Sequence, residues 1–222
     1  MTNTKASKKN KPKRKNFSSL NKETAFIQLN IDELISWSLP ATPIPISHFF
    51  QERLDRLKCR FDLDSRFDLD SCEDAKKLLI DAVCDEALEN IDRLKIWKGA
   101  NLESDTTCGV TDYLIAERKG YLEHPFLCII EAKKDDFEQG LAQCLVEMQA
   151  CQWENRQDKP EFDRDIFGIV TNGDSWQFYK LTPNGEVYET PTYSIGDLEL
   201  LLGRLNYVFH LCEQNLNNPP IR

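Results

Sequence analysis

The sequence contains no long hydrophobic run, and no segment approaches the roughly 18 to 20 consecutive apolar residues that a membrane-spanning helix needs. Its first residues lack the apolar core of a secretory signal peptide, which predicts a cytoplasmic protein without membrane association. The hydrophobic share of 41% is ordinary for a globular protein. A chain of 222 residues is long enough for one domain of moderate size with a real hydrophobic core.

The sequence also lacks the patterns of two common metal sites. None of its eight cysteines forms a Cys-x-x-Cys pair and only three histidines occur, so a zinc site is not expected. Residues 61–72 repeat the motif Phe-Asp-Leu-Asp-Ser, but the glycine and the terminal glutamate of an EF-hand loop are missing. This segment is instead predicted to be a solvated turn that leads to a helix N-cap at Ser71.

Acidic residues are absent from the first 15 positions, which hold seven of the 28 basic residues. The remaining chain therefore has 21 basic against 37 acidic residues, a net charge of −16. Residues 1–20 are predicted to form a disordered basic tail. Such a tail can hold nucleic acid through counterion release, act as a solubilising arm, or rest on its own acidic body, and the composition leaves these alternatives open.

Helical and strand patterns alternate along the rest of the chain. Helices are predicted over residues 22–37, 47–58, 72–96, 135–153 and 195–215. Strands are predicted over residues 109–117, 125–133, 166–171, 175–181 and 187–188. The Asn172-Gly173 pair between two of the strands is a strong signal for a hairpin turn. Together these elements predict an α/β fold with a mixed central sheet of four or five strands flanked by helices.

The strands within residues 109–133 carry the polar residues with the clearest chemical meaning. Asp112 lies near the start of the first strand, and Glu131 and Lys133 lie at the end of the second. Alternate residues of a strand share a face, so Glu131 and Lys133 project together while Ala132 points the other way. If the two strands pair as a hairpin, Asp112 comes close to both.

Two carboxylates and a lysine at the edge of an apolar sheet are costly to bury unless they are paired or bound to metal. Carboxylate oxygens suit a hard cation such as Mg²⁺, with Mn²⁺ as an alternative. A lysine beside such an ion can orient the attacking water and offset charge on a phosphate. These residues therefore point to phosphodiester hydrolysis. The alternative is a purely structural Glu-Lys pair, worth roughly 0.2–1 kcal/mol.

Four elements in a fixed order resemble the PD-(D/E)xK nuclease superfamily, and most closely the N-terminal nuclease domain of type I restriction endonuclease R subunits. They are Asp112, Glu131-Ala132-Lys133, Gly140-Leu141-Ala142-Gln143 and the run from Phe167 to Gly173. The resemblance covers roughly residues 75–181, about half of the chain. Thr111 stands in place of the proline that names the motif, and no helicase motif follows. The resemblance implies a restriction-endonuclease-like sheet.

The resemblance also implies a role for each site residue. Asp112, Glu131 and the backbone carbonyl of Ala132 would be metal ligands, with Asp112, Glu131, Lys133 and Gln143 forming the catalytic set. In that superfamily, a glutamate on the helix before the sheet often helps to organise the metal, and helical phase makes Glu86 the candidate. A surface role for Glu86 is an equal alternative.

The residues predicted to contact nucleic acid are Lys134, Lys9, Lys11, Lys13, Arg14 and Lys15.

The predicted function is a magnesium-dependent endonuclease that acts on DNA, related to restriction or defence systems. A nuclease-like domain that binds a protein partner or nucleic acid without cutting is the alternative, and a homo-oligomer or a partner protein fits either. The predicted organisation is a tail (1–20), a helical extension (21–70), a nuclease domain (71–216) and a frayed end (217–222).

Overall fold

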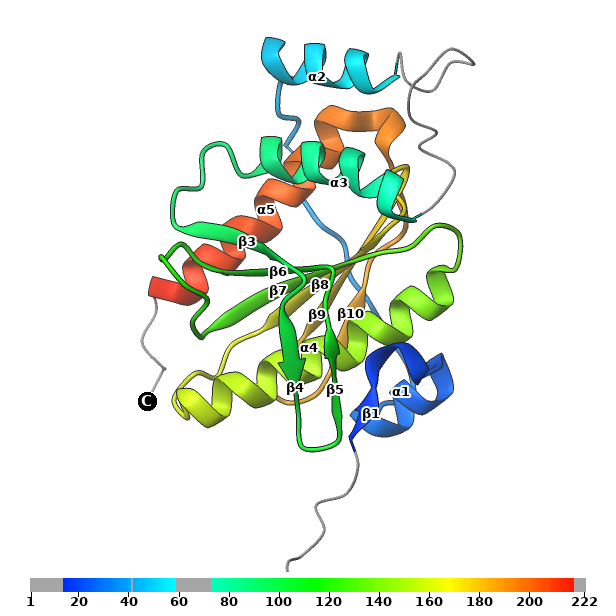
Figure 1. Cartoon of the computed structure of the whole chain (residues 1–222), viewed down its shortest axis with the longest axis vertical. Helices are drawn as coiled ribbons and strands as arrows, with labels where there is room; N and C mark the ends of the chain where they lie inside the picture. The colour runs from blue at the N-terminus through cyan, green and yellow to red at the C-terminus, as the bar shows by residue number, and fades with distance from the viewer. Residues whose placement is uncertain (1–13, 41, 59–72, 218–222) are drawn as a thin grey trace, which may run out of the picture.

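The main sheet lies at the centre of the molecule in the computed structural model, which describes residues 14–40, 42–58 and 73–217 (Figure 1). Seven strands form its path in the order β2, β10, β9, β8, β7, β6 and β3, and an eighth, β11, pairs with β9. Their bounds are β2 Ile35–Ser36, β3 Leu94–Lys98, β6 Tyr113–Glu117, β7 Phe126–Ala132, β8 Ile166–Thr171, β9 Ser175–Leu181, β10 Val187–Glu189 and β11 Tyr193–Ser194.

Strand directions make this sheet mixed. β7 runs parallel to β8, and β2 runs parallel to β10, whereas the other neighbours are antiparallel. The predicted hairpin is confirmed, because β6 and β7 pair antiparallel. The predicted α/β class with a mixed, helix-flanked sheet is confirmed as well. The predicted four or five strands are too few, because β2, β3 and β11 extend the sheet.

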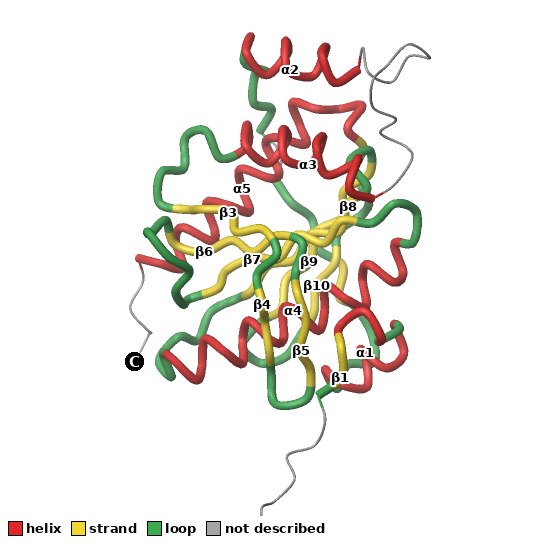
Figure 2. The backbone as a smooth tube through the Cα atoms, in the orientation of Figure 1, coloured by secondary structure: helices red, strands yellow, loops and turns green. Residues whose placement is uncertain are grey.

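Helices cover both faces of the sheet (Figures 1 and 2). On one face, α3 and α5 pack into a core with the sheet, and α2 packs against α3. On the other face, α4 forms a second core, and α1 packs against α4. Their bounds are α1 Lys22–Leu29, α2 His48–Lys58, α3 Glu73–Ala87, α4 Phe137–Asp158 and α5 Leu198–Asn217. None of the helices within the described residues is long and apolar enough to cross a membrane.

Three of the predicted helices have different ends in the structure. α1 ends at Leu29, because Asn30 adopts a left-handed backbone conformation with φ 55° and caps the helix. α3 ends at Ala87, and the next predicted turns instead form β3, which pairs antiparallel with β6. α4 begins after the N-cap Asp136 and continues to Asp158, beyond the end predicted at residue 153.

A small second sheet corrects the prediction of a disordered tail for residues 15–20. Its strands are β1 Lys15–Asn16, β5 Thr107–Val110 and β4 Asn101–Glu103, and β4 and β5 form an antiparallel hairpin. Phe17 and Leu20 are buried directly after β1. A Cβ atom on Gly109 would lie 2.5 Å from the Phe17 ring, so this glycine makes room for Phe17. The repeat at 61–72, with Ser71, lies outside the described residues.

Candidate active site

The hairpin of β6 and β7 places Asp112 beside the end of β7. Tyr113 pairs with Ile130, so Asp112, one residue before β6, stands opposite Glu131 when the register is continued. The Oδ2 atom of Asp112 accepts a hydrogen bond of 2.9 Å from the backbone N–H of Ala132. The Asp112 carboxylate is thereby fixed against the residue that separates Glu131 from Lys133.

Glu131 and Lys133 meet on one face of β7, as strand alternation predicts. The Nζ atom of Lys133 lies 2.7 Å from Oε1 of Glu131, and the Glu131 side chain is only 1% exposed. The backbone N–H of Lys133 donates to the carbonyl of Thr171 at the end of the parallel strand β8. The side chain of Ala132 packs on the opposite face, in the core beneath α3.

The Ala132 backbone also faces the site. A strand residue directs its N–H and its C=O toward the same neighbouring strand. Since the Ala132 N–H reaches Asp112, its carbonyl is expected to face the same side. Asp112, Glu131 and this carbonyl would offer oxygen donors only, the kind of ligand that Mg²⁺ prefers. Within the residues that the structure describes, no group of three or more His, Cys, Asp or Glu side chains forms a metal cluster. Two carboxylates and one carbonyl would leave further coordination positions, which Mg²⁺ ordinarily fills with water.

Helix α4 adds two buried polar side chains one turn apart, Gln143 and Glu147. Burial raises the pKa of Glu147 well above its ordinary value, and the charges of Glu131 and Asp112 raise it further. The amide of Gln143 and the ammonium of Lys133 lower it. No hydrogen bond of regular geometry reaches either Glu147 carboxylate oxygen within the described residues, so the influence of Gln143 is one of proximity. Glu147 is therefore close enough to Asp112, Glu131, Lys133 and Gln143 for each of them to shift its pKa.

We expect Glu147→Gln to stabilise the protein at neutral pH. Because the pKa of Glu147 is raised in the folded state, stability falls as the pH rises above the ordinary value of 4.5 toward the raised value. A glutamine does not titrate, so the variant does not lose this stability as the pH rises above 4.5. Thermal unfolding in EDTA from pH 4.5 to 8 should show a melting temperature a few degrees higher for the variant near pH 7, since about 1 kcal/mol corresponds to roughly 2–4 °C. The difference in melting temperature between variant and wild type should shrink toward pH 4.5. A difference that stays constant with pH would contradict a raised pKa of Glu147.

Helix α3 contributes a lysine rather than the predicted glutamate. The Nζ atom of Lys77 lies 2.7 Å from Oδ1 of Asp112 and 3.2 Å from Oδ1 of Asp74. Glu86, nine residues later, falls about half a turn away on the helix and so faces the opposite direction. Its Oε1 accepts from the backbone N–H of Ser47, at the start of α2. The structure therefore removes Glu86 from the site and gives it a role in seating α2.

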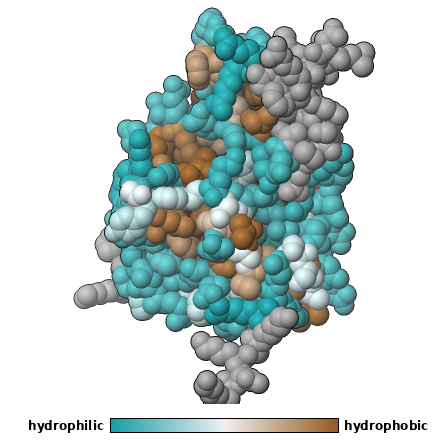
Figure 3. Space-filling model, viewed as in Figure 1, coloured by the Kyte–Doolittle hydropathy of each residue, from teal (hydrophilic) through white to brown (hydrophobic). Residues whose placement is uncertain are grey.

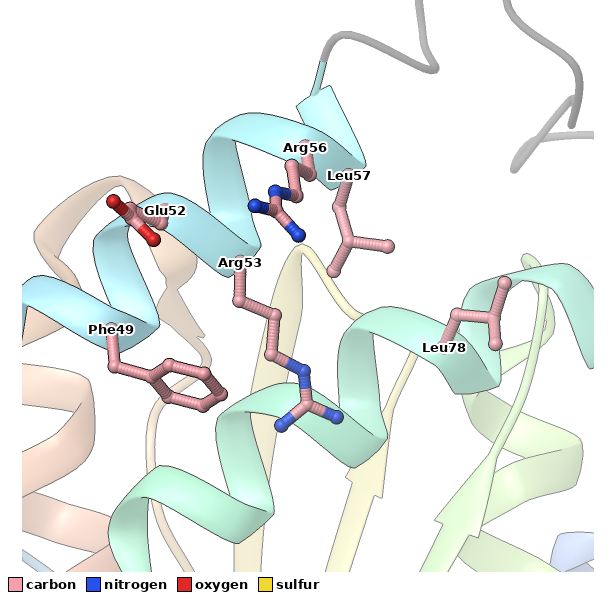
Figure 4. Close-up of a pocket in the computed structure, with 6 residues that line it drawn as sticks. All are labelled: Phe49, Glu52, Arg53, Arg56, Leu57 and Leu78. Atoms are coloured by element: carbon pink, nitrogen blue, oxygen red, sulfur yellow. The ribbon is translucent and has the colours of Figure 1, made fainter.

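Asp112 borders a hollow of about 410 Å³ between α3 and the strand ends. The hollow is lined by Asp74, Lys77, Leu78, Asp81, Lys98, Gly99, Val110, Thr111 and Asp112. A second hollow of about 370 Å³ lies between α2 and α3, with Phe49, Arg53 and Leu57 from α2 and Leu78 from α3 among the residues that line it (Figure 4). Leu78 borders both hollows, which therefore adjoin. Phe49 and Leu78 are exposed, and Figure 3 shows apolar surface gathered on this side of the molecule.

The residues predicted to bind nucleic acid have different surroundings. Lys134 is exposed directly after β7. Arg14 forms an ion pair with Glu103 of β4, so its charge is balanced by the protein itself. Lys15 is exposed in β1. Lys9, Lys11 and Lys13 lie outside the described residues.

Lys77 and Glu147 are not among the site residues predicted from the sequence. The signal for Glu147 is its position four residues after Gln143, which places an acid in the buried stripe of α4. Lys77 had no comparable signal, because the placement of α3 over the strand ends is tertiary. No protein-family model matches the chain, and no curated protein matches it. The superfamily resemblance therefore stays a prediction that depends on the motifs and on the geometry given above.

Proposed function

We propose that the chain is a magnesium-dependent nuclease of the PD-(D/E)xK type, with a restriction-endonuclease-like fold and DNA as its substrate. The observation that carries this proposal is the hydrogen bond from the Ala132 N–H to Asp112. It brings three motif residues of the second strand, Glu131, Ala132 and Lys133, against an acid that lies about 20 positions earlier. A structural ion pair alone would not need this ordered arrangement, in which Asp112 also lines an open hollow while Glu131 is buried.

Each residue has a distinct role in the proposed reaction. Asp112, Glu131 and the Ala132 carbonyl would hold the ion, which supplies Lewis-acid activation of the phosphate and of water. Lys133 orients the attacking water and offsets the negative charge that develops on the phosphate. Gln143 lies on α4 beside this group, and the buried Glu147 is close enough to sense the charges of Glu131 and Asp112. A metal-binding carboxylate held by neighbouring groups keeps its orientation, which is the usual function of such supporting residues.

Basic side chains of α2 also support a phosphate-containing substrate. Lys77 and Lys98 in the hollow beside Asp112 are paired with its aspartates, so a bound ion would have to offset the charge of a phosphate there. Arg53 and Arg56 line the adjoining hollow. Arg53 is held by Asp85 at 2.8 Å, which orients its guanidinium on the surface of α3. Basic groups placed along a path position a nucleic-acid backbone without reading its sequence. The proposal therefore concerns cleavage chemistry and assigns no target sequence.

The test of the proposal is a cleavage assay with supercoiled plasmid, linear duplex, single-stranded DNA and RNA. Each is incubated with the purified protein in Mg²⁺, in Mn²⁺ and in EDTA. We expect cleavage of DNA in either metal and none in EDTA. Absence of cleavage from a folded protein that binds the metal would favour the second candidate, a non-catalytic nuclease-like domain. The ion pair of Lys77 with Asp112 favours that candidate, because it balances a metal-binding carboxylate without metal.

Gly140 gives a further expected result for this site. A Cβ atom at this position of α4 would lie 2.7 Å from Cγ1 of Val170 and 2.9 Å from Cγ of Lys133. Gly140→Ala should therefore displace Lys133 and lower the cleavage rate by roughly 10- to 100-fold, since misplacement by about 1 Å can cost this much. The rate is measured well below the melting temperature. Gly120→Ala is the control, because nothing lies within 4 Å of its added Cβ. Equal rates for the two variants would contradict the positioning role of Gly140.

A further inference from the structure

The Lys77 ammonium pairs with one carboxylate oxygen of Asp112. Its Nζ lies 2.7 Å from Oδ1 of Asp112, while the other oxygen, Oδ2, is engaged by the Ala132 N–H. Both oxygens of this carboxylate thus have donors. The Lys77 side chain is 20% exposed and the Asp112 side chain 18%, so solvent screens the pair only in part. A second cation at Oδ1 meets both steric conflict and charge repulsion from the ammonium.

The lysine has an alternative partner nearby. Asp74 lies one turn earlier on α3, with its Oδ1 already 3.2 Å from the Lys77 Nζ and its side chain 88% exposed. Lysine carries its charge on a flexible four-carbon stem. A movement toward Asp74 would therefore release Asp112 while keeping the ammonium paired. Lys98 lines the same hollow but is bound to Asp81 instead, at 2.8 Å.

We propose that Lys77 is an internal counter-cation that competes with the divalent metal for Asp112 and is displaced onto Asp74 when the metal binds. This inference rests on the proposed function, because it takes Asp112 as a metal ligand. In the ion-free protein, Lys77 keeps Asp112 in place against Ala132. By competing for Asp112, Lys77 also raises the Mg²⁺ concentration at which the site becomes occupied.

Mg²⁺ titration by calorimetry, without nucleic acid, tests this competition. Lys77→Gln removes the charge but keeps an amide donor for Asp112, and Lys77→Met removes both. We expect both variants to bind Mg²⁺ about tenfold more tightly than the wild type, because the competing charge is gone. Lys77→Arg keeps the charge and should stay close to the wild type. Lys98→Met is the matched control, since it removes a cation from the same hollow without touching Asp112, and its affinity should not rise.

Melting temperatures measured with and without Mg²⁺ provide a second test that does not depend on the heat of binding. Without metal, Lys77→Gln should melt at a lower temperature than the wild type, and added Mg²⁺ should raise its melting temperature by more. Unchanged Mg²⁺ affinity in both neutral variants would overturn the role of Lys77, whereas metal-dependent cleavage by the wild type would leave the proposed function in place. Absence of Mg²⁺ binding in the wild type and in all variants would overturn both.

Discussion

Lys133→Ala is expected to reduce metal-dependent DNA cleavage by about 10³-fold or more, because a positioned acid–base group contributes about 10²–10⁴-fold and this lysine also offsets charge on the phosphate. The Lys133 side chain is largely buried against Glu131, so the variant is expected to be less stable than the wild type yet folded at temperatures well below its own melting temperature, where the rate is compared. The rate is measured at saturating Mg²⁺, with circular dichroism and melting temperature recorded on the same sample. Lys134→Ala is the comparison variant: this neighbouring exposed lysine is predicted to contact nucleic acid, so its loss should weaken DNA binding at most and leave the rate at saturating DNA unchanged.

Two features sharpen this test. Lys133 is the ion-pair partner of the buried Glu131, so the alanine variant will lose some stability in the absence of metal. Lys133→Gln restores a hydrogen-bond donor without restoring the charge, and it should be better folded yet equally inactive. Full activity in a folded Lys133 variant would remove this lysine from the reaction and would leave the proposed site without its catalytic amine.

Gly203→Ala is expected to be the most destabilising single methyl addition in the described part of the chain. A Cβ atom at this position of α5 would lie 2.1 Å from the backbone oxygen of Thr42. The conflict is with backbone, so a change of rotamer cannot relieve it. The adjacent hydrogen bond from the Ile44 N–H to the Glu199 carbonyl would be strained as well. Overpacking and loss of this bond together should cost about 2–4 kcal/mol.

Gly203 lies where the segment from Thr42 to Ile44 packs against α5. A loss of this size should lower the melting temperature by roughly 5–15 °C in a chain of this length. Gly120→Ala again serves as the control, since its added methyl group meets open space. A melting temperature for Gly203→Ala within about 1 °C of the control would mean that the segment from Thr42 to Ile44 is not held against α5 in solution.

Local sequence signals predicted the elements that form the centre of the sheet. The apolar runs of β7 and β8 and the Asn172-Gly173 turn between β8 and β9 are strong signals of short range, and all are present in the structure. The predicted secondary structure was wrong where pairing with a distant strand determines the conformation. Residues 94–98 continue an apolar helical pattern, yet they form β3 because β6 offers an open edge with which to pair. β2 is only two residues long and depends entirely on β10.

The same division applies to the site. The positions of Asp112, Glu131 and Lys133 follow from strand alternation and from one hairpin, both of which are local properties. Glu86 was assigned from helical phase alone, and phase cannot tell which side of α3 faces the strand ends. That face carries Lys77 and Asp81, whose contacts with Asp112 and Tyr113 exist only once α3 lies on the sheet. Glu147 is buried against the sheet for the same reason.

The most direct test of the central claim is a calorimetric titration of Mg²⁺ into the wild type and into Asp112→Asn. Asparagine has the same shape, and its one carbonyl oxygen can still accept the hydrogen bond from the Ala132 N–H, but the negative charge and the acceptor for Lys77 are lost. We predict that the wild type binds Mg²⁺ and that Asp112→Asn binds it at least about tenfold more weakly, since a charged oxygen ligand is removed. No binding by the wild type, or equal affinities in the two proteins, would contradict a metal centre built on Asp112 and Glu131.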